Sequence, residues 1–223
     1  MKKVPNCISY LASLTDIGKH FINAAEVKTR SIINACGENP DVTRDSFLVI
    51  GPNIVPYGLN KMGSDVTKLD GLPYYGEEPC ACKVHEGELA DFVAQEQSFD
   101  WVIAPDEWIT YAETEDQQRQ MLSMISKITR KGFFTTVKDY KNMYANQRYF
   151  EEPFVLRTDK GDAIVIRGEE LVMCEPARRR TMYFKQLAKF THDLGASSYT
   201  VEKQNMYKPA FSKTFEYVVC IKF

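Results

Sequence analysis

Short apolar runs alternate with amphipathic stretches along most of the chain. Residues 47–50 (Phe-Leu-Val-Ile) and 66–69 are short extended runs, separated by a glycine-containing polar stretch that predicts a turn and a short helix. A third run spans 101–104 and stops at Pro105, and a fourth spans 133–137. Short runs of apolar and β-branched residues bounded by turn residues are typical of buried strands. We therefore predict four strands at these positions.

The segment between the third and fourth runs has apolar residues at helical spacing. Thr114 and Gln117 form a capping box at its start, and Gly132 is a natural residue to end the helix. A strand, a helix and a strand within about forty residues form a βαβ crossover, so strands 101–104 and 133–137 should be parallel.

Both ends of the chain also show clear patterns. Residues 8–35 have helical spacing and predict one or two amphipathic helices, followed by a linker at 36–45. Towards the other end, a helix is predicted to stop at Gly195, with strands in 198–206 and 215–223. The join between these last strands is too short for a crossover helix, so the pair should be antiparallel.

Residues 145–180 interrupt this order. The stretch "FVLRTDKGDAIVIRG" predicts a β-hairpin with Asp-Lys-Gly-Asp at its turn, which we interpret as an insertion on the rim of the sheet. Residues 77–84 predict a further strand. We expect one α/β domain over 1–223, with N-terminal helices within 1–45 and a mostly parallel sheet that has an antiparallel C-terminal strand.

Composition and charge narrow the class of protein. The chain has 223 residues, of which 44% are hydrophobic and 26% charged, as in ordinary soluble domains. A net charge of −2 argues against a generally basic nucleic-acid-binding protein. No apolar run approaches the ~18 residues of a membrane span, and "MKKVPNCISYL" lacks the apolar core of a signal peptide. Six cysteines without a dense framework suit a reducing compartment, so a cytoplasmic protein without a membrane partner is expected.

The order of the elements resembles a known family. The stretch "SFDWVIAPDEWITYAETEDQQRQMLSMISKITRKGFFTTV" is similar to the second half of class I S-adenosylmethionine-dependent methyltransferases, where an "FD-V-" strand precedes a helix and a "K-GG" turn. The resemblance runs from Phe47 to Phe223, apart from 145–180. It implies a Rossmann-like methyltransferase fold, S-adenosyl-L-methionine as the cofactor, and methyl transfer to an acceptor. The sequence names neither the acceptor nor the oligomeric state.

The glycine loop of that family would fall on Gly51, Pro52 and Asn53, with Gly58 further on. Glycine suits such a loop because the backbone must approach the ligand closely and adopt a positive φ. Here proline and asparagine stand inside the loop, and Ile50 stands where the family commonly has an acid. This degenerate loop leaves a second interpretation open, in which the chain is a methyltransferase-fold binding or structural protein without the cofactor.

The resemblance also implies contacts to the rest of the cofactor. The acid for the ribose hydroxyls falls on Asp70, at the end of the second strand, where one carboxylate can accept from both hydroxyls. Taken alone, Asp70 also fits a turn residue before Gly71. The acid on the adenine side falls on Glu86 or Glu88, and Ala104 lies at the end of the third strand, beside the site.

A narrower resemblance concerns the methyl acceptor. The ending "KPAFSKTFEYVV" is similar to a "KP–SR–E-Y" strand of RNA ribose 2′-O-methyltransferases, although it is two residues shorter. The Lys-Asp-Lys-Glu tetrad of those enzymes would fall on Lys28, Asp106, Lys138 and Glu216. A lysine whose pKa is lowered by its neighbours can deprotonate a ribose hydroxyl. Trp108 and Tyr111 could form walls of the pocket, and RNA is one candidate partner.

Two other features favour less specific interpretations. Cys80, Cys82 and His85 have the residue types of metal ligands, but alternation along a strand explains them better, and we expect no metal. The arginines at 178–180 form a basic run that fits a solvated face or a phosphate contact.

Overall fold

The chain folds as an alternation of helices and strands. The computed structural model describes residues 16–51, 54–69, 82–105, 108, 114–138, 153–157, 163–167, 184–203 and 216–223. The elements are α2 (Asp16–Ile33), the 3₁₀ turn η1 (Ala35–Gly37), β1 (Phe47–Ile50), α3 (Val55–Lys61), β2 (Val66–Leu69), β3 (Lys83–His85), α4 (Leu89–Ala94), β4 (Phe99–Ala104), α5 (Glu115–Ile128), β5 (Thr129–Lys138), β6 (Pro153–Arg157), β7 (Ala163–Arg167), α7 (Phe184–Asp193), β8 (Ser198–Lys203) and β9 (Glu216–Lys222).

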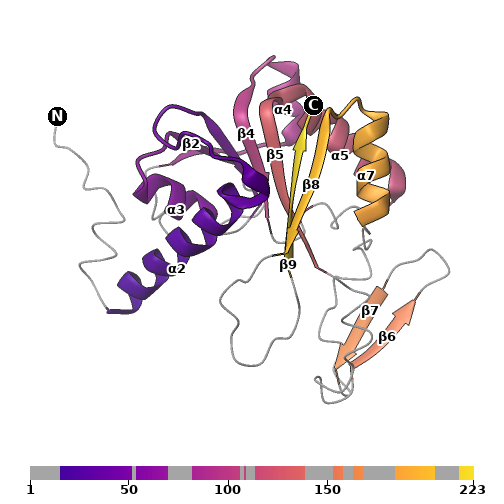
Figure 1. The fold of residues 1–223 in the computed structure, drawn as a ribbon, viewed down its shortest axis with the longest axis horizontal. Coiled ribbons are helices and arrows are strands. Elements are labelled where there is room, and N and C mark those ends of the chain that lie inside the picture. Colours follow the sequence, from indigo (N-terminus) through magenta and orange to yellow (C-terminus); the bar gives the residue numbers. More distant parts are fainter. Residues whose placement is uncertain are drawn as a thin grey trace.

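The centre of the molecule is a seven-stranded sheet in the order β3-β2-β1-β4-β5-β9-β8 (Figure 1). The pairs β1–β2, β1–β4, β2–β3 and β4–β5 are parallel. β9 runs antiparallel to both β5 and β8. The predicted mostly parallel sheet with a reversed C-terminal strand is therefore confirmed.

Helices cover both faces of this sheet. In Figure 1, α2 and α3 lie on one side and α5 and α7 on the other. The strand β1 is buried on both faces, since Phe47 and Val49 join the core under α2 and α3, whereas Leu48 and Ile50 join the core under α4, α5 and α7. A strand covered on both faces reads as a continuous apolar run, which explains its pattern in the sequence.

The helix α2 packs on α3 through a very close contact. A Cβ atom on Gly58 of α3 would overlap the side chain of Thr29 and the carbonyl oxygen of Ala25. The buried Thr29 hydroxyl donates to the carbonyl oxygens of Ala25 (2.7 Å) and Val55 (3.2 Å). Gly58 is therefore required for helix packing, and it is not part of the loop that follows β1.

The helix α5 begins as the sequence predicts but ends earlier. Thr114 and Gln117 form the capping box, with the Gln117 amide donating to the Thr114 hydroxyl (3.2 Å) and the Thr114 amide to the Gln117 side chain (3.1 Å). The helix ends at Ile128, and β5 starts at the next residue. Gly132 lies inside β5, where a Cβ atom would overlap the ring of Trp101. The prediction that Gly132 ends the helix is wrong, because close strand packing requires this glycine.

The remaining predicted elements are found with one shift. Gly195 has φ +83° and follows α7, as expected for a helix end. β6 and β7 pair antiparallel, with Pro153 opposite Arg167 and Arg157 opposite Ala163. They form the predicted hairpin as a separate two-stranded sheet. β3 spans 83–85 and so overlaps the predicted strand 77–84 only at 83–84, and residues 77–81 lie outside the described ranges. Among the helices that the structure describes, none has the length and apolar character needed to cross a lipid bilayer.

Candidate functional site

The strand order places one special position in the sheet. From β1 the chain passes to β2 on one side, and it later returns to β4 on the other side of β1. In open α/β sheets, ligands bind outside the carboxyl ends of the strands at such a reversal of strand order. Here that position is bounded by Gly51, which follows β1, and by Trp108, which follows β4.

Gly51 forms a tight turn at the carboxyl end of β1. Its φ of +86° lies in the left-handed region, which glycine adopts without the steric penalty of a Cβ atom. Its amide donates to the carbonyl oxygen of Leu69 (2.9 Å) and so ties the end of β1 to the end of β2. Gly51 thus ends β1 in a left-handed conformation, and Pro52 and Asn53, which follow it, lie outside the described residues.

Trp108 covers this turn. A Cβ atom placed on Gly51 would lie 3.2 Å from Cδ1 of the indole. The Trp108 amide donates to the carbonyl oxygen of Pro105 (3.3 Å). The half-buried indole packs against the core under α4, α5 and α7. A side chain at position 51 would therefore meet the indole.

The other predicted cofactor residues have different surroundings. Ala104 is fully buried, and its carbonyl oxygen accepts a hydrogen bond from the Thr135 hydroxyl (2.8 Å). Glu86 is exposed directly after β3. Ile50 is part of the core, so this position of β1 contributes no carboxylate. Asp70 follows β2 and lies outside the described residues.

Polar contacts also hold the start of α4 beside the end of β3. The Glu88 amide donates to the Asp91 carboxylate (2.7 Å), and Nε2 of His85 lies 3.3 Å from the same carboxylate. The Glu88 amide and, to a lesser degree, His85 lower the pKa of Asp91. The ring of His85 packs on Phe92 with centroids 4.3 Å apart. His85 is therefore engaged in local structure, as expected of a packing residue rather than a metal ligand.

The described cysteines do not form a reactive site. Cys82 is disulfide-bonded, although the six cysteines without a dense framework suggest a reducing compartment. Burial raises the pKa of the Cys36 thiol, and burial also raises the pKa of the Cys220 thiol, to about 12. Thiols with raised pKa values stay protonated and are poor nucleophiles. Among the described residues, no group of three or more His, Cys, Asp or Glu side chains could hold a metal ion, and Cys80 lies outside them.

The predicted tetrad is only partly covered by the described residues. The backbones of Lys138 and Glu216 are directly opposite each other in the β5–β9 ladder, at the carboxyl end of β5. Lys28 lies on α2 beside Thr29, whose hydroxyl reaches the start of α3. Asp106 and the arginines at 178–180 lie outside the described residues. The fold thus brings two of the four backbones together and leaves the convergence of the four side chains untested.

Sequence reasoning missed one unusual residue near this edge of the sheet. Lys68 of β2 is fully buried, although lysine is almost never buried unless it is paired. It lies two residues after Val66, which belongs to the core under α2 and α3. The period of two along the strand could have revealed it, because Lys68 shares the face of a buried valine.

The opposite edge of the sheet carries a dense polar cluster. Asp45, just before β1, accepts hydrogen bonds from the Trp101 indole (2.7 Å), from the Asp41 amide (3.1 Å) and from the Lys131 ammonium group. Trp101 and Lys131 lie in β4 and β5. This carboxylate therefore links three segments at the amino ends of the strands.

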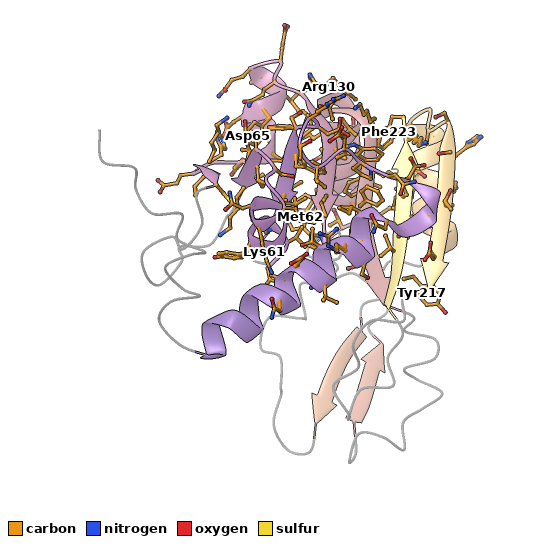
Figure 2. All side chains as sticks on the ribbon, turned by 60° about the vertical axis from the view of Figure 1, so that its left-hand side comes forward. Lys61, Met62, Asp65, Arg130, Tyr217 and Phe223 are labelled. Carbon is orange, nitrogen blue, oxygen red and sulfur yellow. The ribbon has the colours of Figure 1, made fainter. Side chains whose placement is uncertain are left out.

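A second carboxylate reinforces the same edge. Asp100 accepts from the Ser46 amide (2.9 Å) and hydroxyl (3.0 Å), and its other oxygen lies 3.3 Å from the Arg130 guanidinium group. Figure 2 shows Arg130 and Tyr217 at opposite ends of the sheet, with Tyr217 near the start of β9. Because these acids and bases pair with one another, we interpret the amino edge as structural.

Comparison with known proteins gives a consistent picture of the fold. Neither protein-family models nor curated proteins match the sequence. Solved structures do match: a protein from Pyrococcus horikoshii has a TM-score of 0.57 and 12% identity, covering 94% of this chain and 92% of that one. A cyclopropane-fatty-acyl-phospholipid synthase-like protein from Lactobacillus casei has a TM-score of 0.55 and 13% identity, covering 97% and 98%.

A third similar structure is the magnesium protoporphyrin IX methyltransferase from Synechocystis with bound S-adenosylhomocysteine. Its TM-score is 0.53 and its identity 11%, with 93% of this chain and 87% of that chain covered. Likeness at this level of identity concerns the fold. The chain therefore has an α/β, Rossmann-like methyltransferase fold, with a sheet that is mostly parallel.

Proposed function

We propose that this protein transfers the methyl group of S-adenosyl-L-methionine to an acceptor molecule. The observation that carries the proposal is the left-handed Gly51 turn at the reversal of strand order, between the carboxyl ends of β1, β2 and β4. A structurally similar methyltransferase binds S-adenosylmethionine or S-adenosylhomocysteine in its crystals, which supports the choice of cofactor. The fold alone would not decide the function, since one fold serves many activities.

Within this proposal, the chain's own residues divide the binding work. The turn that starts at Gly51 would approach the cofactor through its backbone, with Pro52 and Asn53 inside the loop. Asp70 would accept from the ribose hydroxyls, Glu86 would lie on the adenine side, and Ala104 would close the site at β4. When bound, the cofactor supplies a methyl group already activated on a sulfonium, so the protein needs only to align the acceptor and take its proton.

Calorimetric titration with S-adenosylmethionine and S-adenosylhomocysteine tests the proposal directly. We expect the wild type to bind both and Asp70→Ala to lose about 1–3 kcal/mol of binding free energy, the scale of hydrogen bonds lost at a charged acceptor.

The matched control is Asp65→Ala, at the other end of β2. Asp65 forms an exposed ion pair with Lys83 (2.8 Å), and removing it should leave cofactor affinity unchanged. Equal affinity of the wild type and Asp70→Ala would remove Asp70 from the site.

A second candidate function belongs to a different class. The chain could be a non-catalytic binding or structural protein with this fold, and the buried Ile50 at the end of β1 favours that alternative, because it supplies no polar group to a ligand. A folded wild type that binds neither form of the cofactor would decide for this second candidate.

The acceptor chemistry that we propose to test first is methylation of an RNA ribose 2′-hydroxyl. The feature in its favour is the cross-strand pairing of Lys138 with Glu216. The Lys138 amine would take the hydroxyl proton as the 2′-oxygen gains the methyl group, while Lys28, Asp106 and Glu216 tune that amine.

The test compares RNA with 2′-deoxy oligonucleotides as methyl acceptors. Lys138→Ala should abolish transfer to RNA and keep cofactor affinity, because the lysine acts on the acceptor alone. Lys127→Ala, an exposed lysine on α5, is the control and should keep full activity. Methylation of the deoxy oligonucleotide, or full activity of Lys138→Ala, would exclude this acceptor chemistry.

A further inference from the structure

Trp108 is an aromatic residue at the position where the proposed cofactor would bind. Resting on the function proposed above, we propose that the indole of Trp108 recognises the positive charge of the methyl-donating sulfonium. The protein would then hold the charged methyl donor more tightly than the neutral thioether that remains after transfer. Trp108 would thus act as a specificity-determining residue that favours exchange of product for fresh donor.

The order of the strands places Trp108 at the correct end of such a ligand. The two proposed acids follow neighbouring strands, Glu86 after β3 and Asp70 after β2, and the next strands in the sheet are β1 and β4. A molecule that has its adenosine over β3 and β2 must extend its other end over β1 towards β4. Gly51 and Trp108 follow those two strands. The sulfonium, which lies beyond the ribose, would therefore meet the indole.

The contact between Trp108 and Gly51 fixes the indole there. Cδ1 of the ring lies 3.2 Å from the place where a Cβ atom on Gly51 would be, so the five-membered ring lies against the turn. Packing against the core and the hydrogen bond from its amide to Pro105 hold the residue, but the side chain is only half-buried. It therefore combines a fixed orientation with surface that a ligand can contact.

The chemistry of the surroundings suits recognition by an aromatic ring. The end of β1 contributes the apolar Ile50 and the backbone of Gly51, neither of which carries a charge. The face of an aromatic ring attracts a cation through the quadrupole of the ring. Among the natural aromatic side chains, the indole of tryptophan gives the strongest cation–π attraction. Such a ring can discriminate a sulfonium from a thioether of nearly the same shape, because the two differ in charge.

Binding measurements on two variants test the proposal without any need for the acceptor. The affinities of the wild type, Trp108→Leu and Trp108→Phe are measured with S-adenosylmethionine and with S-adenosylhomocysteine. We expect Trp108→Leu to weaken binding of the sulfonium form about fivefold and to change binding of the thioether less than twofold. Trp108→Phe, which keeps a ring, should lie between Trp108→Leu and the wild type.

Fluorescence provides an independent measurement in the native protein. The chain has two tryptophans, and Trp101 is buried against Phe134 (centroids 5.1 Å apart) at the amino edge of the sheet. A change of emission that occurs in the wild type and is absent in Trp108→Phe therefore reports on Trp108. We expect this change to be larger with the sulfonium form than with the thioether at saturation of each.

The outcomes separate this proposal from the proposed function. If Trp108→Leu binds both ligands more weakly by the same factor, or binds both as tightly as the wild type, charge recognition by Trp108 is overturned. The proposed cofactor site then stands. If Trp108→Leu does not fold, as judged by its thermal unfolding, then an equal emission change with both ligands in the wild type overturns charge recognition. A wild type that binds neither ligand removes the proposed function and this inference together.

Discussion

The two edges of the central sheet use polar residues in opposite ways. At the amino edge, Asp45 and Asp100 accept hydrogen bonds from neighbouring segments and bind β1, β4 and β5 together. At the carboxyl edge, the described residues include a left-handed glycine and a half-buried tryptophan that packs on it. The difference teaches that charged residues at strand ends are not by themselves signs of function. Those that satisfy one another, as at the amino edge, hold the fold.

The two tryptophans give the strongest test of this comparison. Trp101→Ala removes a buried ring that stacks on Phe134 and donates to Asp45, so we expect it to lower the free energy of unfolding by about 3–5 kcal/mol. Trp108→Ala should have a clearly smaller effect, because that ring is only half-buried. Urea unfolding measures both, and equal losses would mean that the tryptophan at the carboxyl edge is just as structural.

Removing the central carboxylate of the amino edge should have the next largest effect. Asp45→Ala leaves the Trp101 indole without its acceptor in a buried place, and we expect a loss of about 2–3 kcal/mol of stability. Asp65→Ala is the control, since its exposed ion pair with Lys83 should contribute less than about 1 kcal/mol. Chemical unfolding measures the stability of both variants. Unchanged stability in Asp45→Ala would contradict a structural role for this edge.

At the carboxyl edge, Gly51→Ala should have a moderate effect on stability and a specific one on binding. Alanine at φ +86° is strained by about 1–2 kcal/mol, and its Cβ would press on Trp108. Gly195→Ala is a close match for the strain alone, because φ there is +83° and nothing lies within 4 Å of the added atom. Loss of cofactor affinity in Gly51→Ala alone is expected, and equal behaviour of the two variants would argue against a site at Gly51.

The smallest expected effect is a pH-dependent change in stability at Asp100. Burial raises the pKa of Asp100, but hydrogen bonds from Ser46 and Arg130 together lower it by more, so the net pKa lies below that of an ordinary aspartate. A lowered carboxyl pKa stabilises the fold above the pKa of the unfolded chain, and this contribution disappears as the pH falls through the folded-state value. Asp100→Asn should therefore be about 1 kcal/mol less stable than the wild type at pH 7.

That difference in stability should shrink as the pH falls below about 4. Unfolding of both proteins at pH 7, 5 and 3 measures it. A difference that stays constant over this range would mean that the charge of Asp100 does not contribute.

The sequence predicted most of the fold because the relevant signals are local. Apolar runs located β1, β2, β4 and β5, and connection lengths gave their directions, as for the short join before β9. The wrong prediction at Gly132 has a physical reason that no local pattern contains. A glycine after a basic helical turn is typical of a helix end, but here it makes room for Trp101 from a strand thirty or so positions earlier.

The candidate site could be predicted only to the level of strand ends. The sequence placed Gly51 and Ala104 at the carboxyl edge because the last residue of a parallel strand and the residue after it must lie there. It could not show that Ile50 is absorbed by the core, that Gly58 serves the α2–α3 contact, or that Trp108 lies on Gly51. Those facts depend on contacts between segments that are distant along the chain, and a linear pattern does not contain them.

The direct passage from α5 into β5 has a consequence for how the protein can change in evolution. α5 ends at Ile128 and β5 starts at Thr129, so no loop residue lies between them. The Thr129 hydroxyl donates to the carbonyl oxygen of Ile125 (2.6 Å) in the last turn of the helix. An insertion here would shift the strand relative to β4 and β9 and turn its buried side chains outward. This junction therefore resists length variation, whereas the connections after β1, β2 and β4 contain residues between their elements and can change length without such a shift.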